Sequence, residues 1–346
     1  MSRLTDVLGI DAPIVLGPFG GLSSVELAGV VSDRGGLGSF GLYGFAPDRV
    51  HETITALRAR TRRPFAVNVW LPTGDEVQPS EVDLAPAIDA LTPLYEAAGA
   101  ERPVTPERFV PDAAEQLAAV LEAAPPVLSV VFGVPDAALV TAARERGIRL
   151  IGTATSVAEA VALDAAGVDA IVASGAEAAG HRVSFLRRAE DSLVGTMALV
   201  PQIVDAVAAP VIAAGGIADR RGVAAALALG ASGVQVGTAF LRTRQSAATE
   251  AHRQAIAGAA DTDTVLTRAM SGRLARGIPN RAMREIETSG VILPFPAQNW
   301  ATGVFRAAAT ARGDGDLVSL WAGQAAGLAT RDDAVDVFDE LAAGLV

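Results

Sequence analysis

Short β-rich runs alternate with alanine-rich helical stretches from Pro13 to about Phe240, and this alternation constrains the fold more than any other feature of the sequence. Several of the runs are almost continuously apolar, as expected of parallel strands that are covered on both faces. Eight strand–helix units at this spacing favour a closed (β/α)8 TIM barrel over an open doubly wound sheet. The predicted strands are Ile14–Leu16, Gly38–Phe40, Phe65–Leu71, Val127–Phe132, Arg149–Gly152, Ala170–Ala173, Val211–Ala214 and Gly233–Val236.

Two stretches interrupt the alternation. Residues 72–111 are rich in proline and acidic residues, whereas about 245–315 is polar, arginine-rich and helical in parts. Two further helices are predicted near the C-terminus, over Leu317–Leu328 and Arg331–Leu345. We therefore expect a barrel over residues 1–244, a smaller and mostly helical lid or substrate domain over 245–315, inserted after the eighth strand, and C-terminal helices over 316–346 that close the barrel.

Composition excludes several kinds of chemistry. The 346 residues include no Cys, and every basic residue is Arg. A disulfide framework, a Cys nucleophile and a Cys metal site are therefore excluded, and so are Schiff-base chemistry on Lys and a P-loop. The 28 basic and 39 acidic residues give a net charge of −11, which would repel nucleic acid, and no polybasic membrane anchor is present.

The apolar runs are short. Gly9, Asp11 and Pro13 break the apolar stretch at the N-terminus, which differs from the uninterrupted apolar region of a signal peptide. Elsewhere Gly, Pro or charged residues end each run well before the roughly 20 residues of a membrane helix. A soluble cytoplasmic protein without a membrane partner is expected.

Glycine turns follow the last two predicted strands. Gly215-Gly216-Ile217 comes after Val211–Ala214, and Gly237-Thr238 comes after Gly233–Val236. In (β/α)8 enzymes these two loops often bind a phosphate, because glycine lets the anion approach the backbone N–H groups at the start of a short helix. Tight turns without any ligand would also use glycine, but the two turns together favour a phosphate site.

His181 is the histidine that the pattern places best for catalysis. It follows the sixth predicted strand within Ser174-Gly175-Ala176-Glu177-Ala178-Ala179-Gly180-His181-Arg182, at the catalytic face of a barrel. An imidazole there can serve as an acid, a base or a partner for an anion. Arg182 would either assist an anionic substrate or pair with a surface acid. His51 and His252 lie in polar helical stretches and are predicted to be solvated.

Two further features each have two possible roles. Asn68 lies in an apolar strand, so its amide would bind either a polar ligand ring or the neighbouring backbone. The run from Gly17 to Gly21 would be either a turn or a backbone surface for a planar ligand. No G-x-G-x-x-G follows the first strand, so a Rossmann domain has little support, and a metal site is not expected.

Taken together, these residues resemble the nitronate monooxygenase family, formerly called 2-nitropropane dioxygenases. The resemblance covers Pro13 to about Gln324 and is densest over 151–240. The similar stretches are Gly35-Gly36-Leu37-Gly38, Pro64-Phe65-Ala66-Val67-Asn68, Ala178-Ala179-Gly180-His181-Arg182, Ala213-Ala214-Gly215-Gly216-Ile217, Gln235-Val236-Gly237-Thr238-Ala239-Phe240, Ser271-Gly272-Arg273-Leu274-Ala275-Arg276-Gly277 and Trp321-Ala322-Gly323-Gln324.

The resemblance implies an FMN-dependent barrel with a smaller lid domain. It gives His181 the catalytic position beside the flavin, and it gives Asn68 a contact with the isoalloxazine. Pro18 and Phe19 take the backbone ledge beside that ring. The FMN phosphate positions fall on Gly216, Gln235, Val236, Gly237 and Thr238, and Ser174, Gly180 and Gly215 complete the cofactor-binding set. Relatives usually carry Gln in place of Ser174, Gly in place of Ala179 and Met in place of Phe19.

The implied activity is oxidative denitrification of alkyl nitronates, in which a nitronate and O2 give a carbonyl compound and nitrite through a flavin radical. An alternative within the same barrel family is an FMN-dependent reductase that passes electrons from NAD(P)H to a quinone or an enoyl thioester. A (β/α)8 enzyme that acts on a phosphorylated metabolite without a flavin would also fit the glycine turns. The expected partners are a small-molecule electron donor and O2, and a homodimer is left open.

Overall fold

Eight parallel strands form the core of the protein, as the computed structural model shows; it describes residues 3–345. Their order in the sheet is β1-β9-β8-β6-β5-β4-β3-β2, and a bridge between Val15 and Leu37 joins β1 to the β2 side and closes the barrel. The predicted (β/α)8 fold is confirmed. The strands are β1 (Ile14–Leu16), β2 (Gly38–Gly41), β3 (Phe65–Trp70), β4 (Val127–Val131), β5 (Arg149–Ala154), β6 (Ala170–Ser174), β8 (Val211–Ala214) and β9 (Gly233–Val236).

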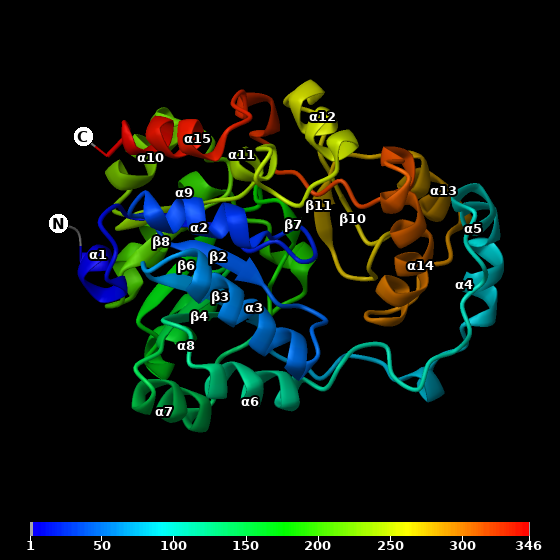
Figure 1. The fold of residues 1–346 in the computed structure, drawn as a ribbon, viewed down its shortest axis with the longest axis horizontal. Helices are drawn as coiled ribbons and strands as arrows, with labels where there is room; N and C mark the ends of the chain where they lie inside the picture. The colour runs from blue at the N-terminus through cyan, green and yellow to red at the C-terminus, as the bar shows by residue number, and fades with distance from the viewer. Residues whose placement is uncertain (1–2, 346) are drawn as a thin grey trace.

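Helices surround this barrel (Figure 1). Many begin where the sequence supplies a short polar side chain that accepts a hydrogen bond from the first helical turn, as Ser24, Asp136 and Asp219 do. The surrounding helices are α1 (Arg3–Leu8), α2 (Val25–Asp33), α3 (Pro47–Arg60), α6 (Ala113–Ala123), α7 (Ala137–Glu145), α8 (Val157–Ala166), α9 (Thr196–Ala206), α10 (Arg220–Ala228), α11 (Thr238–Leu241) and α15 (Ala334–Ala342).

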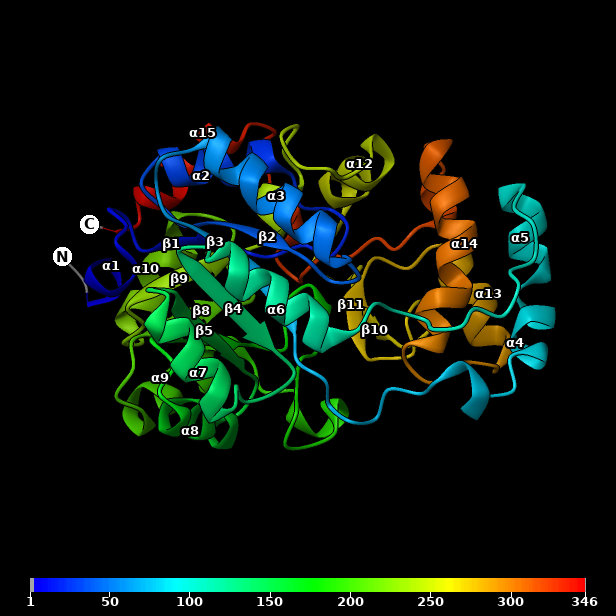
Figure 2. The ribbon, with the colours of Figure 1, turned by 60° about the horizontal axis from the view of Figure 1, so that its bottom comes forward.

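A second hydrophobic core lies beyond the barrel. It brings α4 (Ala85–Ala90) and α5 (Thr92–Ala98) together with α13 (Arg281–Ser289) and α14 (Ala297–Ala311). These helices lie side by side at the right of both views (Figures 1 and 2). The hydroxyl of Tyr95 on α5 donates to the carbonyl of Ala301 on α14 at 3.1 Å. The proline-rich interruption after the third strand thus packs against the region that follows the eighth.

A small antiparallel sheet connects the two cores. Its order is β10 (Val265–Thr267), β11 (Ala275–Gly277) and β7 (Gly180–His181), so the loop after the sixth barrel strand pairs with the region that follows the barrel. Single 3-10 turns lie at Pro79–Glu81, Ala189–Ser192, Gly315–Leu317 and Ala326–Leu328, and helix α12 (Glu250–Gly258) packs against the last two of them. The division into parts at residues 244 and 315 stays a prediction.

One predicted helix, over Leu317–Leu328, is wrong. Apart from its two ends, which lie in 3-10 turns, this stretch is largely irregular. Its backbone pairs with β11 instead: Ile278 donates to the carbonyl of Leu320 at 2.8 Å, and Trp321 bridges to Gly277. Because these long-range hydrogen bonds replace helical ones, the local pattern could not reveal them. Within residues 3–345, no helix combines the length and the apolar character that a membrane span requires.

Candidate active site

A cavity of about 390 Å³ lies at the carboxyl ends of the barrel strands. This is the catalytic face of (β/α)8 enzymes. The cavity brings together nearly all of the predicted site residues, namely Pro18, Phe19, Asn68, Ser174, Gly180, His181, Gly215, Gly216, Gln235, Gly237 and Thr238. Val236 does not line it, because its side chain is buried in the barrel core and its carbonyl accepts a hydrogen bond from the N–H of Gly17 at 2.8 Å.

The glycine turns after β8 and β9 form a shallow backbone cradle on one wall. Gly215 and Gly216 have φ angles of +107° and +73°, a region that other residues rarely adopt. A Cβ atom added to Gly216 would lie 3.6 Å from Cβ of Glu177, and one added to Gly237 would lie 3.6 Å from Cε1 of Phe19. A side chain at either turn would fill space that a ligand could occupy. The four-residue helix α11 begins directly after Gly237.

Asn68 lies on β3, in register with Ser129 on β4. Its Nδ2 donates to the hydroxyl of Ser129 at 2.8 Å and to the Ser129 carbonyl at 3.3 Å. The neighbouring strand therefore holds the amide in one orientation, with the amide oxygen left to accept a hydrogen bond at the cavity. Of the two roles left open for Asn68, the structure shows the bond to the neighbour and places the residue on the cavity wall.

His181 on β7 faces the cavity between two aromatic rings. The ring centroids of Trp70 and Trp321 lie 4.9 and 5.6 Å from that of the imidazole, and Nε2 lies 2.8 Å from the hydroxyl oxygen of Ser271. Burial, together with the positive charges of Arg273 and Arg306, lowers the pKa of His181 to about 3. The imidazole is therefore neutral near neutral pH.

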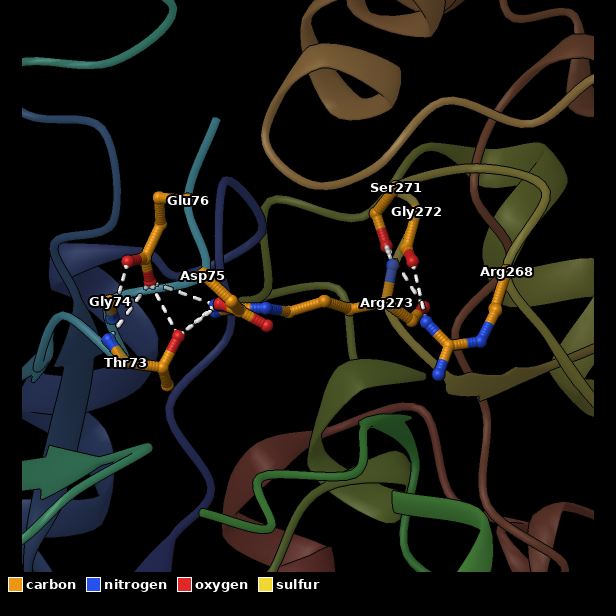
Figure 3. A network of polar contacts seen from close by, with 8 residues as sticks. All are labelled: Thr73, Gly74, Asp75, Glu76, Arg268, Ser271, Gly272 and Arg273. Carbon is orange, nitrogen blue, oxygen red and sulfur yellow. Dashed lines mark hydrogen bonds and ion pairs between the residues drawn. The ribbon is translucent and has the colours of Figure 1, made fainter. Parts of the chain in front are cut away.

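The loop that carries Ser271 is fastened to the turn that follows β3. Figure 3 shows the side chain of Arg273 extending to the turn at residues 73–76. Its Nη2 lies 2.6 Å from Oγ1 of Thr73, 2.5 Å from Oδ1 of Asp75 and 2.8 Å from Oε1 of Glu76. Burial alone would raise the pKa of Glu76, but hydrogen bonds from Thr73 and Arg273 lower it to about 2. This ion cluster fixes the position of Ser271 beside His181.

Aromatic rings form the wall on the side of the second core. The ring of Trp70 lies 4.2 Å from that of Tyr43 and 5.7 Å from that of Phe295, measured between centroids. Asn299 on α14 donates from Nδ2 to the hydroxyl of Tyr43 at 3.4 Å. The guanidinium of Arg273 lies over Phe295, 4.0 Å from its centroid. The barrel and the second core thus enclose the cavity together.

Several of these residues had no role assigned from the sequence. Tyr43 and Trp70 stand just after or at the end of barrel strands, a position that could have marked them. Ser271 reaches His181 across 90 residues of sequence, and Arg306 lies within a regular helix. Ser271 begins one of the stretches that carry the family resemblance, but that stretch gave it no role, and nothing in the local sequence of Arg306 indicates a site.

Two predictions about charged side chains are wrong. Arg182 neither reaches a substrate nor pairs with a surface acid: it is 2% exposed and donates to the carbonyls of Ser174, Gly175 and Ser192. His252 is not solvated, since it is also 2% exposed and its Nε2 lies 3.0 Å from the carbonyl oxygen of Trp321. His51 is half-exposed, as predicted, with Nε2 3.6 Å from Glu122.

Comparisons with known proteins point to one family. A family model described as nitronate monooxygenase matches residues 1–343. A probable nitronate monooxygenase of Staphylococcus aureus (strain MRSA252) is 42% identical over 342 residues, which cover 98% of this chain and 96% of the relative.

Solved structures agree with the sequence match. Nitroalkane oxidase from Streptomyces ansochromogenes superposes with a TM-score of 0.86 at 35% identity, covering 99% of this chain and 98% of the other. FabK from Thermotoga maritima superposes with a TM-score of 0.78 at 30% identity, covering 99% and 94%.

Proposed function

The chain belongs to the nitronate monooxygenase family, a family of FMN-dependent oxidoreductases, and from that premise we propose that it oxidises alkyl nitronates with O2 to a carbonyl compound and nitrite. One observation carries the proposal: a neutral histidine and a glycine cradle lie on the walls of a single cavity. The small-molecule donor and O2 would meet in this cavity.

The residues on the walls fit FMN. A Cβ at Gly216 or Gly237 would make only ordinary van der Waals contacts, so a phosphate could approach the backbone of both turns. The other residues proposed to bind FMN that line the cavity are Gln235, Thr238, Ser174, Gly180 and Gly215. The amide oxygen of Asn68 and the Pro18–Phe19 ledge would contact the flavin ring. When bound, FMN supplies the redox chemistry, whereas the protein positions the reactants and excludes competing reactions.

His181 would hold the nitro group of the substrate. Its Nε2 is hydrogen-bonded to Ser271, and Nδ1 has no hydrogen-bond partner among residues 3–345. Where the Ser271 hydroxyl donates to Nε2, Nδ1 carries the proton and donates to a nitronate oxygen; in the other tautomer Nδ1 is free to accept a proton from a neutral nitroalkane. Because the imidazole is neutral, neither role requires a charge on His181.

Nitrite release tests the proposal. Purified, flavin-loaded protein should release nitrite from ethyl and propyl nitronates in air, with O2 consumed in step. Absence of nitrite from both substrates would remove the proposed function. Rapid loss of the visible flavin absorbance on anaerobic mixing with NADH would instead favour the reductase alternative.

The cofactor assignment has its own test. Gly216→Val should weaken FMN binding at least tenfold, because the new side chain would occupy the space beside the proposed phosphate position. Gly290→Val is a matched control: Gly290 also has a positive φ, of +67°, but ends α13 with open space around it. FMN titration by fluorescence quenching compares the two variants. Equal FMN affinity in both would contradict the assignment.

A further inference from the structure

Arg306 on α14 lines the cavity, and no carboxylate among residues 3–345 pairs with it. Its Nη2 donates to the carbonyl and to the Oδ1 of Asn299, both at 2.8 Å, and Nη1 donates to Ser319 at 3.3 Å. Nε is buried and has no hydrogen-bond partner within the described chain. Burial lowers the pKa of Arg306 to about 10, so the guanidinium still carries its charge at neutral pH.

The other charges near the cavity are already compensated. Glu177 also lines it, but its carboxylate accepts hydrogen bonds from the N–H and hydroxyl of Thr196 and lies near Arg182 and Arg276. Arg273 is paired with two acids, Asp75 and Glu76. A desolvated cation without a counter-ion is unfavourable, so an anion from outside the chain would stabilise Arg306.

The groups around Arg306 suit a planar oxyanion. Burial raises the pKa of Tyr43 to about 12, so its phenol stays protonated and can donate. Asn299 links Arg306 to Tyr43, and Tyr43 stacks on Trp70, whose ring contacts His181. A ligand beside His181 would therefore meet one fixed positive charge and neutral hydrogen-bond donors on this side.

We propose that Arg306 is the anion-binding residue of the cavity and that it selects the anionic nitronate, or a carboxylate of the same shape, over the neutral nitroalkane. The identity of the reacting group rests on the proposed function, whereas the anion site itself does not. Arg306 would act through its positive charge and the remaining N–H of Nη1, because charge-assisted hydrogen bonds to an anionic oxygen are stronger than those to a neutral one.

Isothermal titration calorimetry with two redox-inert probes tests this on the purified holoprotein. Isobutyrate has the branched carbon skeleton of propyl 2-nitronate and a planar anionic head, and isobutyramide is its neutral counterpart. Wild-type protein should bind isobutyrate at least tenfold more tightly than isobutyramide. Equal affinities would overturn the proposal without the need for any variant.

Variants of Arg306 then test whether this residue supplies the positive charge that binds the anion. Arg306→Gln should weaken isobutyrate binding at least tenfold and keep the affinity for isobutyramide within twofold of the wild-type value. Arg306→Lys keeps a positive charge, so it should weaken isobutyrate binding less than Arg306→Gln does. Arg312→Gln is the control, since Arg312 ends the same helix, is exposed and donates to the carbonyl of Ala97. Unchanged isobutyrate binding in Arg306→Gln, or equal weakening of both probes, would contradict the proposal.

Failure of the proposed function and failure of the anion site would give different results. A protein that binds isobutyrate through Arg306 but releases no nitrite from propyl 2-nitronate would keep the anion site and lose the nitronate activity. Nitrite release that is unchanged in Arg306→Gln, with KM for the nitronate also unchanged, would keep the activity and overturn the role of Arg306.

Discussion

Two desolvated histidines, His181 and His252, differ in what their Nε2 atoms contact and in whether they line the cavity. Burial lowers the pKa of both, to about 3 and about 4. His252 bonds to the carbonyl of Trp321 from within α12, away from the cavity lining. His181 bonds to Ser271 and lines the cavity. The comparison teaches that a depressed pKa alone does not mark a catalytic residue, because desolvation acts on structural and functional groups alike.

The two histidines should differ most in the effect of their substitution on turnover. His181→Asn should retain FMN and lose about 10²–10⁴-fold in the rate of nitrite release, since general acid–base or hydrogen-bonding catalysis contributes on that scale. Stopped-flow or steady-state nitrite assays, normalised to bound flavin, measure it. A rate equal to that of the wild type would remove His181 from the reaction.

Acid should destabilise the fold before it protonates the folded histidines. Because their folded pKa values lie below the ordinary value of 6.5, the unfolded chain takes up protons that the folded chain does not, and stability falls as the pH falls from about 6.5 toward 4. His252 should account for about 2 kcal/mol between pH 6.5 and 5. Urea unfolding at both pH values checks this, and a difference that is unchanged in His252→Leu would contradict it.

At neutral pH, His252→Leu should lower the free energy of unfolding by about 1–3 kcal/mol, because the buried carbonyl of Trp321 would lose its donor. Nitrite release per folded molecule should stay within about threefold of the wild type, since His252 does not line the cavity. Urea melts and activity assays on the same preparation separate the two quantities. Loss of turnover without loss of stability would reverse the contrast with His181.

The smallest effect is expected at Ser271, which holds His181 without facing the substrate. Ser271→Ala should lower kcat about tenfold, in keeping with the loss of one buried hydrogen bond that orients the ring. Ser271→Thr, which keeps the hydroxyl, should recover part of that loss. If alanine and threonine gave the same kcat, Ser271 would have no positioning role.

Much of the fold could be predicted because its signals are local. Apolar strands, alternating helices and glycine turns at the strand ends specify the barrel, and the cavity lies where parallel strands of that barrel must end. The burial of His252 could not be predicted, since it depends on the carbonyl of Trp321, 69 residues away. Arg182 bonds to carbonyls only 7 to 10 residues away, but they lie in an irregular loop whose path has no periodic pattern.

The site residues divide in the same way, into those that local sequence indicated and those that it did not. The sequence indicated His181 and the glycines because they stand on barrel loops, whereas Arg306 and Ser271 come from the region that packs over the barrel. Their partners lie far away in the chain, as with the 90 residues between Ser271 and His181. The pairing of residues 84–98 with α13 and α14 is likewise a product of packing between two segments with no shared pattern.

Anaerobic mixing of the flavin-loaded protein with two electron donors tests the central claim most directly. We expect propyl 2-nitronate to change the visible flavin spectrum, as one-electron reduction does, within the time of one turnover, and NADH to leave the spectrum unchanged over the same time. Rapid bleaching with NADH, and no spectral change with the nitronate, would contradict the account.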